Sequence, residues 1–255
     1  MFSIKKYKIK YIYFFIFIFL FFLCFFYMKQ YKIEFFENLL VYPIYFIHLK
    51  ESKQRYQHML HQCQNKHCIR IDAINGKKDK LNIQNVKSKS LKKTSIACFQ
   101  SHIKALETFI KSPYTYGIII EDDIIFEKDF EHKVKEVLDE IGKDGFDIIY
   151  FGGTRICGEK YSKHLIKAKQ IRPNCNAGAF AYMVNKHSAN RILERYQIDG
   201  IYKMYDHQLR DYFGDMKIFY TNPPLVKHNY DLPSDRLHKH YQSNYIQSAN
   251  QIHLL

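Results

Sequence analysis

The sequence predicts an α/β fold with a mostly parallel sheet, behind one apolar N-terminal segment. Short apolar runs alternate along the chain with longer amphipathic stretches, and there is no internal repeat. This alternation is typical of strands joined by helical crossovers, which build a parallel sheet. Hydrophobic residues make up 47% of the 255 residues and charged residues 25%, which excludes a mostly disordered chain.

The predicted strands are short apolar runs bounded by turn residues or proline. The first follows Pro43, the second precedes the turn dipeptide Asn75-Gly76, and the third ends in three consecutive acids. In chain order, the predicted strands cover residues 44–49, 69–73, 117–120, 147–151, 179–184 and 217–220.

The predicted helices carry apolar residues three and four positions apart. Ser52 can cap the first helix, and the second helix opens at Thr94 or Ser95 and is stopped by Pro113. The first helix covers about residues 53–64, and three later helices are predicted over residues 130–141, 187–196 and 205–213.

The formal net charge is +14, with the densest run of lysines in residues 77–93. That segment has no clear period and is predicted to be a solvated loop. It lacks the interleaved aromatic residues that a stacking platform for bases needs. We therefore expect no nucleic acid among the partners of this chain.

Residues 11–28 form an uncharged, apolar run of 18 residues, just enough to span the hydrocarbon core of a membrane. Four lysines precede it, so the positive-inside rule places the N-terminus in the cytoplasm. We predict a basic cytoplasmic tail over 1–10, a transmembrane anchor over 11–28 and a stem over 29–41. The protein would then be a single-pass type II membrane protein, with its catalytic domain on the non-cytoplasmic side. The alternative is a cleaved signal peptide, but no small-residue cleavage site follows the run.

The cysteine pattern gives no support to a zinc site, because none of the six cysteines forms a C-x-x-C pair. Cys63 and Cys68 could be bridged in an oxidising compartment, although spacing alone does not decide this. Cys98 falls at the spacing of apolar core residues and is interpreted as a small hydrophobic side chain.

Three consecutive carboxylates, Glu121, Asp122 and Asp123, follow the strand predicted over 117–120. Like charges so close together are costly unless a divalent cation binds them, and Mg²⁺ and Mn²⁺ prefer oxygen ligands. In an extended segment, Glu121 and Asp123 would share one face and Asp122 would lie on the other. The alternative is the first turn of a helix, where the helix dipole favours acids.

Several segments, in this order, resemble glycosyltransferase family 25, which includes lipooligosaccharide and collagen galactosyltransferases. The family's I-x-x-I-N-L strand is similar to residues 44–49, with His48 in the Asn place, and Arg55 follows. Its R-x-x-A-x-x-G element matches Arg70, Ala73 and Gly76.

The resemblance continues through the rest of the chain to about residue 230. The family's G-C-x-x-S-H helix is similar to residues 97–102, with Ala97 in the Gly place, and its L-E-D-D segment to residues 120–123. The later strand, the Asp in the next helix and the paired prolines are matched by Gly178, Ala181-Tyr182, Val184, Asp206 and Pro223-Pro224.

This resemblance implies a GT-A fold, a Rossmann-like nucleotide-diphospho-sugar transferase domain, over residues 42–232, with a C-terminal tail over 233–255. It implies a UDP-sugar donor and a divalent ion, Mn²⁺ or Mg²⁺, that holds the diphosphate. The implied metal ligands are Asp123 and Glu121; His228 is a candidate third ligand, with a surface histidine as the alternative. The residues implied to lie at the nucleotide are Ile47, His48, Arg55, Arg70, Ala73, Gly76, Ser101, His102, Glu121 and Asp122.

The sequence therefore predicts a membrane-anchored hexosyltransferase of glycan or lipopolysaccharide biosynthesis. It would move galactose from UDP-galactose onto a glycan or protein hydroxyl, and the resemblance implies inversion. Inversion needs a general base at the acceptor oxygen, for which Asp206 is the candidate and Asp211 and Glu194 are rivals. The main alternative is a degenerate, non-catalytic membrane-tethered relative that binds sugar nucleotide or glycan.

Overall fold

The computed structural model describes residues 18–27, 42–169, 175–233 and 252–254. The chain divides into two compact units, residues 1–41 and residues 42–255. In the first unit, residues 18–27 are helical. In the described part of the chain, no helix has both the length and the apolar character needed to cross a membrane. The predicted cytoplasmic tail and stem, and the remainder of the predicted anchor, lie outside the described residues.

The second unit is built on a mixed sheet. Among the described residues it has nine strands, in the order β11-β6-β7-β9-β5-β8-β3-β1-β2. β4 and β10 pair separately as a two-stranded sheet. The strands are β1 (Ile44–His48), β2 (Cys68–Asp72), β3 (Tyr116–Glu121), β4 (Ile124–Phe126), β5 (Ile148–Tyr150), β6 (Ile156–Lys160), β7 (Leu165–Ala168), β8 (Ala181–Asn185), β9 (Ile218–Thr221), β10 (Val226–His228) and β11 (Ile252–Leu254).

The predicted α/β class is confirmed, but the expectation of a mostly parallel sheet is wrong. β1 runs parallel to β2 and β3, whereas β8 runs antiparallel to both of its neighbours, β3 and β5. The chain reaches β8 from β5 through the antiparallel pair β6–β7 and not through a helix. Only parallel neighbours need a long crossover connection, so this route allows the reversed strand.

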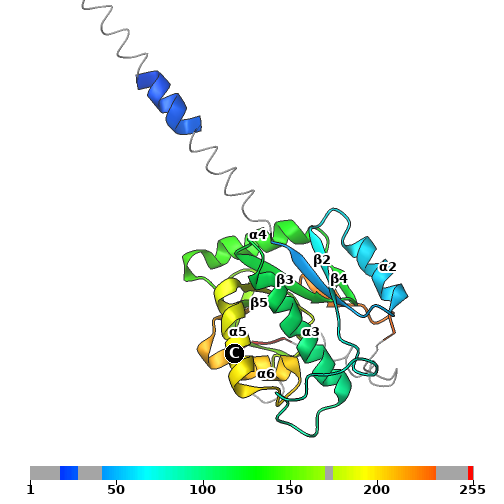
Figure 1. The fold of residues 1–255 in the computed structure, drawn as a ribbon. Coiled ribbons are helices and arrows are strands. Elements are labelled where there is room, and N and C mark those ends of the chain that lie inside the picture. Colours follow the sequence, from blue (N-terminus) through cyan, green and yellow to red (C-terminus); the bar gives the residue numbers. More distant parts are fainter. Residues whose placement is uncertain (1–17, 28–41, 170–174, 234–251, 255) are drawn as a thin grey trace, which may run out of the picture. The chain divides into compact units, whose positions relative to one another are not determined.

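Helices cover both faces of the sheet and make a three-layered unit (Figure 1). α3 (Lys93–Ile110), α5 (Lys186–Asp199) and α6 (Tyr205–Asp211) pack on one face, and α2 (Lys53–Gln62) and α4 (Phe130–Ile141) on the other. Alternate residues of β1 point to the two faces. Tyr45 and Ile47 pack toward α3, and Ile44 and Phe46 pack toward α4. Two short 3₁₀ turns follow α4 and α6, at Gly142–Asp144 and Phe213–Asp215.

Several strands have no counterpart in the sequence prediction. β6 and β7 lie within residues 154–175, where no strand is expected, and β11 lies in the predicted C-terminal tail. A disulfide between Cys157 and Cys175 holds β6 to the segment that leads into β8. Cys63 and Cys68 also form a disulfide, a pairing that their spacing alone had left open.

The lysine-rich segment forms no helix or strand before α3 begins, as predicted. It is nevertheless anchored to the unit by a parallel bridge between Val86 and Ile201. The backbone N–H of Lys87 also donates to the Ile201 carbonyl at 2.8 Å. The later part of the segment is therefore fixed beside Ile201, which follows α5.

Candidate active site

A cleft of about 500 Å³ opens where β1 and β3 end, on the face of the sheet that α3 and α6 cover. Its volume lies within the range of small-molecule sites in proteins. The carboxyl ends of strands are also where ligands bind in open α/β sheets. Most of the residues predicted for the site line this cleft, namely Ile47, Arg55, Ala73, Gly76, Ser101, His102, Glu121, Asp122, Asp123, Asp206 and His228.

Two residues predicted to contact the nucleotide do not line the cleft. Arg70 is on β2 with 41% of its side chain exposed, where it pairs with Asp72 at 3.0 Å and lies over the ring of Tyr56. His48 is 2% exposed, and its Nδ1 is hydrogen bonded to Asp122 Oδ2 at 2.7 Å. In this geometry, His48 stabilises the acidic segment through a buried hydrogen bond and does not face the cleft.

Arg55 holds two of the three consecutive acids. Its Nη1 donates to Asp122 Oδ1 at 2.7 Å, and its Nη2 lies 2.8 Å from Asp123 Oδ2. The guanidinium also donates from Nε and Nη2 to the carbonyl of Pro233, at 3.1 and 2.8 Å. Because residues 122–123 form a turn directly after β3, the expected strict alternation of faces is wrong: both aspartates reach the same arginine.

Asp123 keeps one carboxylate oxygen for another partner. Its Oδ1 is buried and, in the part of the chain that the structure describes, has no hydrogen-bond partner. Leaving a carboxylate oxygen buried and unsatisfied is costly, so a cation or donor at this position would be stabilising. Glu121 also faces the cleft, with 27% of its side chain exposed. Glu121 and Asp123 thus offer oxygen donors of the type that divalent ions take, but with His228 they do not form a three-residue group whose ligand atoms lie within 4.8 Å of one another.

His228 lies beside the carboxylate of Asp123, with its Nε2 3.3 Å from Asp123 Oδ2. Burial by itself lowers the pKa of His228, but the hydrogen bond and the charge of Asp123 outweigh burial and raise it above its ordinary value of 6.5. Its Nδ1 is buried and lacks a hydrogen-bond partner among the described residues. The side chain of His228 is 23% exposed and lines the cleft, and its role as a ligand stays a prediction.

Asp206 lies at the start of α6, on the rim formed with the segment before β8. Its Oδ2 accepts from the backbone N–H of Gly178 at 3.1 Å, and its Oδ1 accepts from the N–H of His207 at 2.9 Å. Gly178 has a φ of +91°, a conformation that favours glycine and directs this N–H to the carboxylate. The two rival acids, Asp211 and Glu194, do not line the cleft.

Several cleft residues were not among those predicted. Lys77 and Lys78 open the lysine-rich segment and line the cleft, where they supply positive charge. Cys98 is half-buried and faces the cleft, so its assignment to the core is wrong. Tyr230 follows His228, and the two rings stack with centroids 4.9 Å apart. The spacing of Cys98 and His102, four residues apart on α3, is the one signal in the sequence that could have placed the thiol beside the site.

Gly76 fits the site for a steric reason. A Cβ added to it would come within 2.7 Å of the Lys93 carbonyl oxygen and of the Thr94 Cα. The loop after β2 therefore packs directly against the backbone at the start of α3. This contact closes one wall of the cleft, and it explains a glycine at this position without any ligand.

The model of glycosyltransferase family 25, described as an LPS biosynthesis protein, matches residues 41–206, well over half of the chain. The chain belongs to glycosyltransferase family 25. The match runs from the segment just before β1 into the start of α6, and it confirms the family that the sequence motifs suggested. All three consecutive acids at the end of β3, residues 121–123, fall inside the matched range.

One curated relative is a glycosyltransferase 25 family member of Aedes aegypti, which is 28% identical to this chain over 108 residues. The aligned part covers 42% of this chain and 18% of the relative. Procollagen galactosyltransferase 2 of Homo sapiens is 25% identical over 168 residues, 59% of this chain and 27% of its own. The matched part of the chain thus spans about a quarter or less of each relative.

A solved structure of UDP-glucose pyrophosphorylase complexed with UDP-glucose aligns over 82% of this chain and 99% of its own chain, at 12% identity and a TM-score of 0.45. That likeness is too remote to inform fold or function.

Proposed function

We propose that this family 25 protein is a glycosyltransferase that uses a sugar nucleotide as donor. The transferred sugar is a hexose, with galactose from UDP-galactose as the first candidate, and the acceptor is a hydroxyl of a glycan or protein. The observation that carries the proposal is the acidic segment at the end of β3, whose Glu121 and Asp123 line the cleft, with Asp123 Oδ1 buried and without a hydrogen-bond partner among the described residues. The name of the human relative supports galactose.

A divalent ion, Mn²⁺ or Mg²⁺, fits the oxygens of Asp123 and Glu121, with His228 in contact with the same aspartate. When bound, such an ion neutralises the charge that develops on a leaving diphosphate. Arg55 and His48 keep Asp122 and Asp123 in place from the protein side. Lys77 and Lys78 add positive charge at the wall of the cleft, where donor phosphates would benefit from it.

Asp206 is the proposed general base for the acceptor hydroxyl. It lines the same cleft as the acidic end of β3, and two backbone N–H groups fix its carboxylate. A fixed carboxylate at the acceptor oxygen can accept the proton as the new bond forms, which is what direct inversion requires. Inversion itself is proposed because of the family resemblance.

The cellular setting is proposed from the sequence. Residues 11–28 would anchor the chain as a single-pass type II membrane protein, with residues 42–232 on the non-cytoplasmic side. The two disulfides among the described residues support an oxidising compartment for this unit. The acceptor would then be a glycan or lipopolysaccharide precursor, or a protein, on that side of the membrane.

The deciding experiment measures UDP release by the full chain in detergent, with a panel of UDP-sugars and Mn²⁺. We expect slow release from one sugar, dependent on the ion and lost in Asp123→Asn. The matched control is Glu159→Gln, which removes a half-exposed acid of β6 that pairs with Lys169 outside the cleft. UDP binding without release from any sugar would favour the non-catalytic relative, and absence of both would overturn the proposal.

A further inference from the structure

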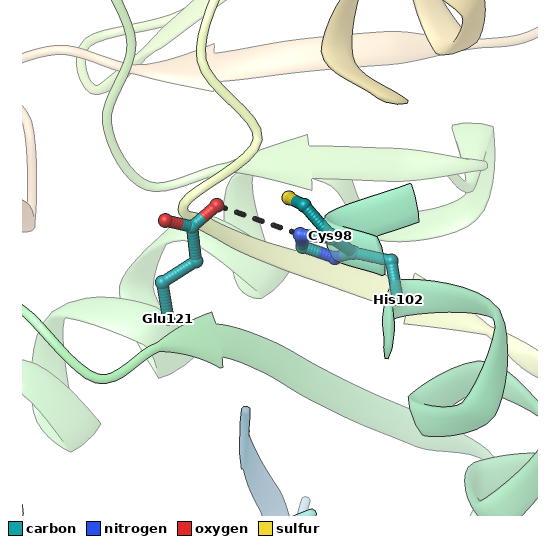
Figure 2. A group of neighbouring side chains, drawn as sticks. All are labelled: Cys98, His102 and Glu121. Atoms are coloured by element: carbon teal, nitrogen blue, oxygen red, sulfur yellow. Dashed lines mark ion pairs between the residues drawn. The ribbon is translucent and has the colours of Figure 1, made fainter. Parts of the chain in front are cut away.

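Three side chains of different chemistry converge at one side of the cleft (Figure 2). Cys98 and His102 are four residues apart on α3, so both project from the same face of the helix. Glu121 is the last residue of β3. One ligand atom from each residue lies within 4.8 Å of the other two, and no other such three-residue group occurs among the described residues.

The spacing between two of these atoms suits a metal better than a direct contact. His102 Nε2 lies 3.5 Å from Glu121 Oε1. A charge-assisted hydrogen bond would bring such atoms to about 2.8 Å. Two ligands of a tetrahedral zinc ion, each about 2.1 Å from it, are separated by about 3.4 Å. The observed distance therefore leaves room for an ion between the nitrogen and the oxygen.

Other contacts fix the imidazole of His102 in the orientation that a ligand needs. The residue is 1% exposed, and its ring stacks on Tyr205 with centroids 4.2 Å apart and planes 8° apart. Its Nδ1 lies 3.3 Å from Tyr182 Oη, and the two tyrosine hydroxyls are 2.8 Å apart. In this arrangement, the hydroxyl of Tyr182 can accept a hydrogen bond from Nδ1–H of His102 and donate one to the hydroxyl of Tyr205. Outer contacts of this kind orient metal-binding histidines and leave the other nitrogen for the ion.

We propose that Cys98, His102 and Glu121 form a binding site for a thiophilic divalent ion, represented by Zn²⁺. A thiolate and an imidazole select zinc over the oxygen-preferring Mg²⁺ and Mn²⁺. Three protein ligands leave a fourth position, which here faces the cleft because Cys98, His102 and Glu121 all line it. No C-x-x-C pair marks this site in the sequence, since its third ligand comes from a distant strand.

The same three residues do not form a nucleophile–base–acid triad. In such a triad the acid orients the histidine through one ring nitrogen, while the other nitrogen faces the nucleophile. Here Nδ1 of His102 faces Tyr182, and Figure 2 shows the sulfur of Cys98 and the carboxylate of Glu121 on the side of the same ring nitrogen. Convergence on one nitrogen is the arrangement of ligands around an ion.

The zinc site shares Glu121 with the site proposed for Mn²⁺ or Mg²⁺, but it uses a different set of partners. An ion held by Cys98 and His102 would occupy the carboxylate of Glu121 and withdraw it from Asp123. The two ions therefore compete for one side chain. Binding of Zn²⁺ itself does not depend on whether the chain is a glycosyltransferase, so the two proposals can fail separately.

The test uses the full chain in detergent, stripped of metal with a chelator and then titrated with Zn²⁺ or Co²⁺. Co²⁺ reports the thiolate directly, through a sulfur-to-cobalt charge-transfer band. The decisive variant is Cys98→Ser, and the matched control is Cys24→Ser, which removes the other cysteine outside the disulfides, within residues 18–27. Thermal melts of the metal-free proteins check that both variants fold.

We expect the charge-transfer band in the wild type and in Cys24→Ser, and its loss in Cys98→Ser. Zn²⁺ binding should weaken by roughly tenfold or more in Cys98→Ser. Zn²⁺, but not Mn²⁺, should also slow alkylation of the Cys98 thiol by iodoacetamide. Absence of the band in the wild type would overturn the proposal even if Cys98→Ser does not fold. Equal Zn²⁺ affinity of a folded Cys98→Ser would overturn it as well.

Discussion

Arg55 donates a hydrogen bond from Nη1 to Oδ1 of Asp122 at 2.7 Å, and the two side chains are only 9% and 6% exposed. Asp122 accepts from Arg55 with one oxygen and contacts His48 with the other. Both carboxylate oxygens of Asp122, the middle acid of the three, are therefore in contact with other side chains of the protein. Its two neighbours, Glu121 and Asp123, are the acids proposed to hold an ion, so the proposal gives the three acids one structural role and two binding roles.

The first prediction concerns the stability that Arg55 provides. Arg55→Met leaves the buried carboxylates of Asp122 and Asp123 without their cation, which should cost about 3–5 kcal/mol of unfolding free energy. The control is Arg70→Met, because Arg70 pairs with Asp72 at the surface and such pairs contribute about 1 kcal/mol or less. Urea unfolding of the detergent-solubilised chain measures both. Similar losses for the two variants would contradict the central role of Arg55.

The second prediction concerns His48, which stands where the family motif has Asn. The side-chain nitrogen of Asn is separated from Cα by the same number of bonds as Nδ1 of histidine. His48→Asn should therefore keep the contact to Asp122 and change stability little, whereas His48→Leu should cost about 1–3 kcal/mol, since it leaves a buried carboxylate oxygen unsatisfied. The same unfolding measurement compares them. The expectation fails if His48→Leu unfolds like the wild type.

The third prediction separates chemistry from structure at Asp206. Asp206→Asn keeps an oxygen that can accept one of the two backbone hydrogen bonds but removes the base. We expect kcat to fall by about 10²–10⁴-fold, with little change in the KM for the donor or in the melting temperature. Asp211→Asn is the control, because Asp211 pairs with Lys203 outside the cleft. A lower melting temperature with unchanged kcat would assign Asp206 a purely structural role.

The elements that carry the cleft were readable from the sequence for a physical reason. β1 and β3 are buried on both faces, so each appears as a continuous apolar run. α4 has a narrow apolar stripe, and its predicted bounds, 130–141, agree with the structure. The three acids stand out because they end the apolar run of β3 abruptly. Local patterns of this kind are independent of what the rest of the chain does.

The remaining features depend on contacts between distant segments. β6 is buried only over its first residues and ends in Glu159 and Lys160, so its sequence has neither a run nor an alternation. The reversed direction of β8 follows from the route of the chain and not from its own residues. The proximity of Cys98 to Glu121 joins a helix to a strand end, and the contact of Arg55 with the carbonyl of Pro233 spans 178 positions. No local pattern encodes such pairs.

The fourth prediction concerns acid sensitivity away from the cleft, at Glu140 on α4. Its carboxylate accepts from the Ser162 hydroxyl and from the backbone N–H of His164 at 3.0 Å, and contacts His164 Nδ1 at 2.5 Å. Burial raises the pKa of Glu140, but these hydrogen bonds together outweigh burial and lower it below its ordinary value of 4.5. A carboxylate whose pKa is lower in the folded state stabilises the fold above its unfolded pKa. That contribution is lost as the pH falls through the folded pKa.

As the pH falls from 6 to 3, the melting temperature of the wild type should therefore decrease more steeply than that of Glu140→Gln. The variant cannot titrate at this position and is less stable at neutral pH. Thermal melts from pH 6 downward, past the ordinary carboxylate value of 4.5, measure the difference. Glu136→Gln is the control, because Glu136 lies one turn earlier on the same helix, is 47% exposed and contacts His132 at 4.0 Å. Its melts should follow those of the wild type. Parallel curves for Glu140→Gln and the wild type would show that this carboxylate does not contribute to acid sensitivity.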